Sequence, residues 1–172
     1  MRRITLVAIV VALTSSVSSA QSRSSGHSPL DGVWKVAEVI TTGANASTNT
    51  SPQPGLMIFS GRYYSLMTIG GDKPRPSFDP AKDPNNLTDA EKIARFEQWN
   101  ELTANSGTYE IRGTTIIRHP MVAKNVTVMT PDPANPPVPQ AFTVKGDTMW
   151  LTSKSAPGQP AGEARMRFTR LH

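Results

Sequence analysis

Apolar and polar positions alternate in short runs along most of this chain, the pattern typical of half-buried β-strands. The first run, residues 33–41 (VWKVAEVIT), is rich in β-branched side chains. Later runs are paired across glycine-containing turns and predict three hairpins. The predicted strands after the first are 56–59, 62–69, 107–111, 114–122, 126–129, 142–145, 148–152 and 164–171. Eight or nine short strands joined mostly by tight turns predict an all-β protein, either an antiparallel sandwich or a closed barrel.

One segment has helical spacing instead. Residues 88–91 (TDAE) match a capping box, in which a threonine side chain and a glutamate three residues later satisfy free backbone N–H groups. The apolar residues Ala90, Ile93 and Phe96 then recur at helical spacing, followed by Trp99. The sequence predicts a single inserted α-helix from Asp89 to about Leu102, with its apolar face docked on the sheet.

The N-terminal residues predict export. Arg2 and Arg3 precede an apolar run over residues 4–13, and small residues at 18–20 resemble a cleavage site. We therefore expect residues 1–20 to be a signal peptide, residues 21–29 a disordered lead-in and residues 30–172 the folded domain. The apolar run is shorter than the ~20 residues that a membrane-spanning helix needs, so we expect a periplasmic or secreted protein without stable membrane insertion.

The composition excludes several kinds of binding and catalytic site. The 172 residues suit one domain, and the absence of cysteine excludes disulfides, thiolate metal sites and thiol nucleophiles. The formal net charge is +5, of which the predicted signal peptide carries two, and no basic cluster indicates a nucleic-acid partner. His119 is the one histidine away from the chain ends, too few for a multi-histidine metal site. We expect no metal or other cofactor, and the sequence does not predict the oligomeric state.

Several segments in order resemble a known family. Residues 30–34 (LDGVW) place Gly-x-Trp on the first strand, and residues 61–65 (GRYYS), 107–111 (GTYEI) and 146–151 (GDTMWL) follow. With these motifs, residues 28–171 resemble the small lipocalin-like domain of many bacterial and fungal proteins. The resemblance implies an up-and-down β-barrel with a central cavity. The family's biochemical role is mostly unassigned, so the resemblance implies no particular activity.

The resemblance also implies a structural plug. In lipocalin-type barrels an arginine near the last strand closes over the tryptophan of Gly-x-Trp. Here Gly32 precedes Trp34, and strand alternation places Arg170 on the apolar side with Met166 and Phe168. We predict a stacked contact between Trp34 and Arg170 at a closed end of the barrel.

Strand alternation suggests which residues line the cavity. It places Glu38 on the face of Trp34, His119 on one face with Ile117, and Tyr109 and Met149 on inner faces. If the helix covers the open mouth, Phe96 and Trp99 lie near any ligand, whereas a helix on the outer wall would keep them away. The predicted ligand-binding residues are Glu38, Phe96, Trp99, Tyr109, Ile117, His119 and Met149.

These features favour an exported barrel that binds a small, mainly apolar molecule. One alternative is an isomerase or cyclase that uses His119, Glu38 or Tyr109 as an acid or base in the cavity. Another is a protein-interaction or inhibitor module that presents the proline-rich loop 131–139. No residue is assigned a catalytic role, because no second titratable group is spaced to tune His119.

Overall fold

The computed structural model describes residues 28–75, 85–129, 137–155 and 161–172. The predicted signal peptide, and large parts of the two proline-rich loops, lie outside these residues. The strands and the helix predicted from the sequence all lie within them.

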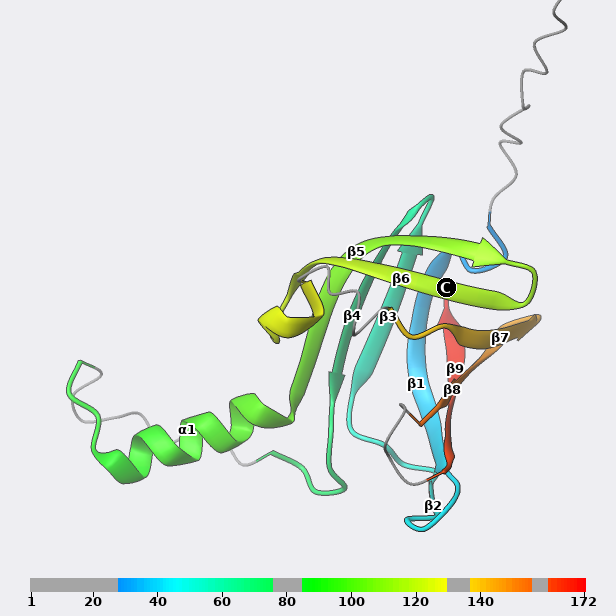
Figure 1. Ribbon diagram of the computed structural model, residues 1–172. Coiled ribbons are helices and arrows are strands. Elements are labelled where there is room, and N and C mark those ends of the chain that lie inside the picture. Colours follow the sequence, from blue (N-terminus) through cyan, green and yellow to red (C-terminus); the bar gives the residue numbers. More distant parts are fainter. Residues whose placement is uncertain (1–27, 76–84, 130–136, 156–160) are drawn as a thin grey trace, which may run out of the picture.

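The described residues form a closed antiparallel barrel of eight strands with one additional strand (Figure 1). The barrel strands are β1 (Gly32–Thr41), β3 (Gly55–Ser60), β4 (Tyr63–Ile69), β5 (Leu102–Arg112), β6 (Thr115–Ala123), β7 (Gln140–Lys145), β8 (Thr148–Lys154) and β9 (Glu163–Leu171). Each pairs with the next, and β9 returns to pair with β1. The short strand β2 (Ser47–Asn49) pairs with the end of β1. This confirms the predicted up-and-down barrel.

Two-residue turns set the register of three hairpins among the described residues. The closing pairs are Ser60 with Tyr63, Arg112 with Thr115, and Lys145 with Thr148. The first turn residue is Gly61, Gly113 or Gly146, with φ of 58°, 60° and 57° respectively. Glycine adopts positive φ without steric cost, and a glycine at this position suits the tight turns that match strand twist.

The core fills the barrel from the end where β1 begins. Large side chains such as Trp34 and Phe168 are fully buried, and each such burial contributes roughly 1.5–3 kcal/mol. The buried residues are Leu30, Trp34, Val36, Met57, Phe59, Tyr64, Tyr109, Ile116, Met149, Leu151 and Phe168. They come from seven of the eight barrel strands and from the residues just before β1, so one core holds the barrel together.

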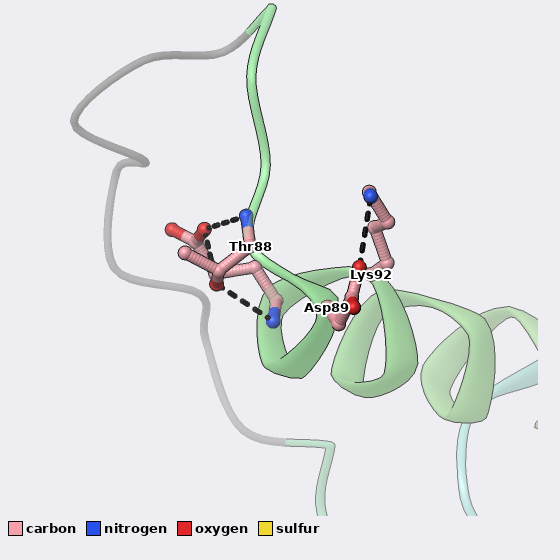
Figure 2. Close-up of polar contacts among 4 residues, drawn as sticks. Thr88, Asp89 and Lys92 are labelled. Atoms are coloured by element: carbon pink, nitrogen blue, oxygen red, sulfur yellow. Dashed lines mark hydrogen bonds and ion pairs between the residues drawn. The ribbon is translucent and has the colours of Figure 1, made fainter.

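The helix α1 (Asp89–Glu101) has the predicted capping box. The backbone N–H of Thr88 donates to Glu91 Oε2 at 2.7 Å, and the Glu91 N–H donates to Thr88 Oγ1 at 3.3 Å (Figure 2). In the same view Lys92 pairs with Asp89 at 3.0 Å. These contacts satisfy backbone donors at the start of the helix, so its N-terminus was predictable from four residues.

The predicted docking of this helix on the sheet is wrong. No residue of α1 is buried, and Ile93, Phe96 and Trp99 remain more than half exposed. Figure 1 shows α1 projecting away from the barrel. The helix continues into β5 without a loop, so its axis cannot fold back onto the sheet. Helical spacing identified an apolar stripe but not a partner for it.

The predicted strand at residues 126–129 is also wrong, since Val126–Met129 form a 3₁₀ helix, η1. Asn125 explains the difference. Its side-chain oxygen accepts from the Thr127 N–H at 3.0 Å, and its carbonyl accepts from the Val128 N–H at 3.3 Å. Such local bonds compete with strand pairing and favour a turn.

Candidate ligand-binding site

One end of the barrel is closed by a tryptophan and an arginine. The Arg170 guanidinium carbon lies 4.0 Å from the centroid of the Trp34 ring, so the predicted stacked contact is present. The Trp34 indole N–H donates to the Leu30 carbonyl at 2.6 Å. Arg170 donates to the carbonyls of Pro29, at 3.1 Å, and of Asp31. The charge and the indole N–H are thus both satisfied within the closed end.

The residues before β1 complete this closed end. Asp31 accepts from the backbone N–H groups of Ser28 at 3.0 Å and Gly61 at 3.1 Å, which joins the chain entering the barrel to the β3–β4 turn. A Cβ on Gly32 would lie 2.7 Å from Arg170 Nη1, and Gly32 has a φ of 127°. The positive φ favours glycine, and a Cβ there would displace the end of the Arg170 side chain from its present position.

The other end of the barrel is open and contains a cavity of about 300 Å³. Its inner wall consists of Val36 and Val39 of β1, Thr68 of β4, Thr103 of β5 and Met166 of β9. Its rim consists of Ser47, Asn49, Pro52, Gln53, Ile69, Gly70 and Gly71. The barrel therefore has one sealed end and one accessible end.

A second pair of polar residues consists of Tyr64, which pairs with Phe59, and Arg118, which pairs with Tyr109 across β5 and β6. Tyr64 is 3% exposed, and its hydroxyl donates to Asn105 Oδ1 at 2.8 Å. The Arg118 guanidinium carbon lies 5.4 Å from the centroid of the Tyr64 ring. Burial raises the pKa of Tyr64, an effect that the positive charge of Arg118 opposes. Burial lowers the pKa of Arg118, but arginine keeps its proton in proteins.

Arg118 lacks the partners that a buried guanidinium normally has. Its Nη1 atom is buried and has no hydrogen-bond partner. Within the described ranges no carboxylate lies within 4.0 Å of its side chain. Buried charges are normally paired, because removing them from water is costly. Among the described residues, Tyr109 Oη and Gln140 Oε1 are also buried without a hydrogen-bond partner, and Arg118 is the charged member of the three.

The predicted site residues are not brought together by the fold. Met149 is fully buried in the core, and Tyr109 is buried with its ring centroid 5.0 Å from that of Phe59. Burial raises the pKa of Tyr109, an effect that the nearby Ser28 hydroxyl opposes. Tyr109 thus belongs to the closed end. Phe96 and Trp99 lie more than half exposed on the projecting helix α1, whose last residue, Glu101, accepts from the Gly70 N–H at the rim of the cavity.

Ile117 and His119 lie on the outer face of β6, contrary to the expectation from alternation. The buried residue of this strand is Ile116, so the even-numbered positions 116 and 118 face inward. The His119 side chain is 47% exposed, with Nε2 3.4 Å from Glu110 Oε1. The two adjacent isoleucines at 116 and 117 make either choice of face plausible from β6 alone.

Glu38 also faces outward, because β1 contains a β-bulge. The register shifts between Val36 and Glu38, so alternation reverses beyond this point. Glu38 Oε2 accepts from Arg167 Nε at 3.1 Å on the outer surface. There the Arg165 guanidinium carbon lies 4.4 Å from the centroid of the Trp150 ring. The prediction that Glu38 lines the cavity is therefore wrong.

Sequence reasoning missed Arg118, although a consistency test would have found it. A two-residue turn always pairs an odd-numbered residue with an even-numbered one. Tyr109 was placed inside, so its cross-strand neighbour had to be even-numbered, and the structure pairs Tyr109 with Arg118. Applying this odd–even rule to β5 and β6 together would have predicted that Arg118, rather than His119, faces the barrel interior.

No family model matches the chain, and no curated protein or solved structure is significantly similar to it. The barrel architecture is consistent with a lipocalin-like fold. No helix in the described part of the chain is long and apolar enough to span a bilayer. The described residues also contain no group of three or more His, Cys, Asp or Glu side chains that could hold a metal ion.

Proposed function

We propose that this protein is a lipocalin-like barrel that binds a small, mainly apolar molecule in its interior. The observation that carries the proposal is the asymmetry of the barrel: Trp34 and Arg170 seal one end, and a cavity of about 300 Å³ lies at the other. That volume is at the lower end of the range for small-molecule sites. Methionines at 57, 149 and 166 supply adaptable apolar surface inside.

The catalytic alternative receives less support. It required His119, Glu38 or Tyr109 to act in the cavity, and these residues lie on the outer face of β6, on the outer face of β1 and at the closed end. The interaction alternative concerns loop 131–139, most of which lies outside the described residues. Binding is therefore the function that the described geometry supports best.

A neutral fluorescent probe tests the proposal. N-phenyl-1-naphthylamine, whose emission rises in apolar surroundings, should bind the purified protein. Thr103→Phe fills the cavity with a side chain and should weaken binding at least tenfold. The matched control is Thr143→Phe, which places the same side chain on the outer face of β7 and should leave binding unchanged. Equal binding by both variants, or no emission change with the parent protein, would contradict a site in the cavity.

We further propose that the protein is exported and that residues 1–20 are removed. Support comes from the basic, apolar and small-residue segments of the N-terminus. Expression of the full chain in a Gram-negative host should yield a periplasmic or secreted product whose mass corresponds to a start at Gln21. A cytoplasmic product of full mass would contradict this proposal.

A further inference from the structure

The cavity at the open end has an aliphatic wall and a wall that carries hydroxyl groups. The aliphatic wall consists of Val36, Val39 and Met166, and Val39 pairs directly with Met166 across β1 and β9. The hydroxyl wall consists of Thr68 and Thr103, which pair directly across β4 and β5. A molecule in this cavity therefore meets apolar surface from one pair of strands and hydroxyl groups from the other.

A glycine on the strand between them brings the two walls together. β3 lies between β1 and β4 in the barrel, and its first residue, Gly55, is buried. A Cβ on Gly55 would lie 2.8 Å from Cγ2 of Val36 and 2.8 Å from Cγ2 of Thr68. The missing side chain places Val36 and Thr68 within reach of one small molecule.

The two threonine hydroxyls have no side-chain hydrogen bond among the described residues. On the outer face of the same two strands, Ser106 Oγ donates to Ser65 Oγ at 2.8 Å, so that pair of hydroxyls is satisfied internally. Directly paired residues have Cβ atoms about 4.5–5.5 Å apart. One ligand oxygen placed between Thr68 and Thr103 can therefore bond with both hydroxyls.

The cavity contains no charge that could hold an ionised ligand. None of the described residues that line it is acidic or basic. A carboxylate lies at the rim, because a Cβ on Gly71 would be 3.4 Å from Glu101 Oε1. Moving a charged group out of water is costly unless an opposite charge and hydrogen bonds replace the water. The lining therefore favours an uncharged ligand, and the rim carboxylate further disfavours an anion.

We infer that the ligand is an uncharged molecule with an aliphatic body and a hydroxyl group, and that Thr68 and Thr103 bind this hydroxyl; this inference rests on the proposed function. A threonine hydroxyl donates one hydrogen bond and has two acceptor positions, so the pair can both donate to the ligand oxygen and accept from it. The aliphatic body then covers Val36, Val39 and Met166, where its burial is favourable.

The first test compares three eight-carbon compounds as competitors of N-phenyl-1-naphthylamine for the purified protein at pH 7. 1-Octanol carries the hydroxyl, 1-chlorooctane has chlorine in its place, and octanoate is charged. 1-Octanol should displace the probe. Octanoate should compete at least tenfold more weakly than 1-octanol, because nothing in the described lining compensates its charge.

Removal of the two hydroxyls should weaken binding of the alcohol alone. The double variant Thr68→Val/Thr103→Val keeps the shape of both side chains and should bind 1-octanol about tenfold more weakly, because the buried ligand hydroxyl loses its partners. The same variant should bind 1-chlorooctane at least as tightly as the parent protein does. Thr143→Val makes the same change on the outer face of β7 and should leave both affinities unchanged.

The outcomes separate this inference from the proposed function. Equal binding of 1-octanol by the parent protein and the double variant, or an equal loss for 1-octanol and 1-chlorooctane, overturns the role of the threonines. Octanoate that competes as tightly as 1-octanol overturns the uncharged class of ligand. In these cases the parent protein still binds the probe and the proposed function stands. Failure of the probe and of all three compounds to bind the parent protein overturns both.

A second measurement needs no variant. Intermolecular nuclear Overhauser effects locate the two ends of 1-octanol bound to the parent protein. Protons on the carbon that bears the hydroxyl should contact the methyl groups of Thr68 or Thr103, and the terminal methyl group should contact those of Val39 or Met166. The reversed orientation would overturn the inference.

Discussion

Two arginines at inward-facing positions of the barrel, Arg118 and Arg170, each lie against an aromatic ring, and they differ in their hydrogen-bond partners. At the closed end, Arg170 stacks on Trp34 at 4.0 Å and donates to two backbone carbonyls. Its Nε also lies 3.7 Å from Asp147 Oδ1. In the interior, Arg118 lies 5.4 Å from the Tyr64 ring centre and has a buried Nη1 atom with no acceptor.

The difference separates a compensated guanidinium from an uncompensated one. A guanidinium whose donors are satisfied stabilises the fold, because its charge and N–H groups are compensated on folding. A buried guanidinium N–H without an acceptor destabilises the fold. By this criterion Arg170 contributes to stability, whereas Arg118 does not.

The largest effect is expected at the closed end. Trp34→Ala should lower the free energy of unfolding by about 3–5 kcal/mol, because it leaves a cavity and removes the surface on which Arg170 stacks. Urea denaturation measures this. Trp99→Ala is the matched control, since that side chain is 56% exposed on α1, and it should change stability by less than about 0.5 kcal/mol. Equal effects of the two substitutions would contradict the assignment of the core.

The second-largest changes in stability are expected for substitutions of the two arginines, and the two substitutions should differ in direction. Arg170→Met loses the bonds to Pro29 and Asp31 and should destabilise the protein by about 2–3 kcal/mol. Arg118→Met removes an unpaired cation and keeps an apolar stem, so stability should be unchanged or rise by up to about 1 kcal/mol. Thermal and urea denaturation of both variants decide the matter. A clear loss of stability in Arg118→Met would mean that Arg118 has a structural partner.

The smallest expected effect is a change in the pKa of Tyr64. Arg118 opposes the rise that burial causes in the pKa of Tyr64, so Arg118→Met should raise this pKa further and leave that of Tyr109 unaffected. NMR of tyrosine labelled at the ring carbon that bears the hydroxyl measures both. An unchanged pKa for Tyr64 would mean that the charge of Arg118 does not act on Tyr64, and it would contradict the contact between the two side chains.

The same pKa values predict how stability depends on pH. Both tyrosines have raised pKa values in the folded state, so the folded protein keeps its protons while the unfolded chain loses them near pH 10. Their contribution to stability is complete below that pH and is lost as the pH rises through the folded values. Urea denaturation between pH 8 and 11 should therefore show falling stability, and a constant or rising value would contradict the burial of both hydroxyl groups.

Features determined by local sequence were the predictable ones. The hairpins followed from glycine turns flanked by alternating residues, and the start of α1 followed from Thr88 and Glu91. The contact between Trp34 and Arg170 was also anticipated, through the family resemblance and the alternation of β9.

Features that depend on how elements meet were not predictable in the same way. A β-bulge after Val36 turned Glu38 outward, and alternation within one strand cannot reveal such an insertion. The face of β6 required the register of its partner β5, which places Arg118 rather than His119 inside. The apolar stripe of α1 did not specify a contact, because the helix leads straight into β5.

The central claim is that a small apolar ligand binds in the cavity at the open end of the barrel. Intermolecular nuclear Overhauser effects with bound N-phenyl-1-naphthylamine test it directly. The account predicts contacts from the rings of the probe to the methyl groups of Val39 or Met166. Contacts to Phe96 or Trp99 of α1 instead would place the ligand outside the barrel and contradict the account.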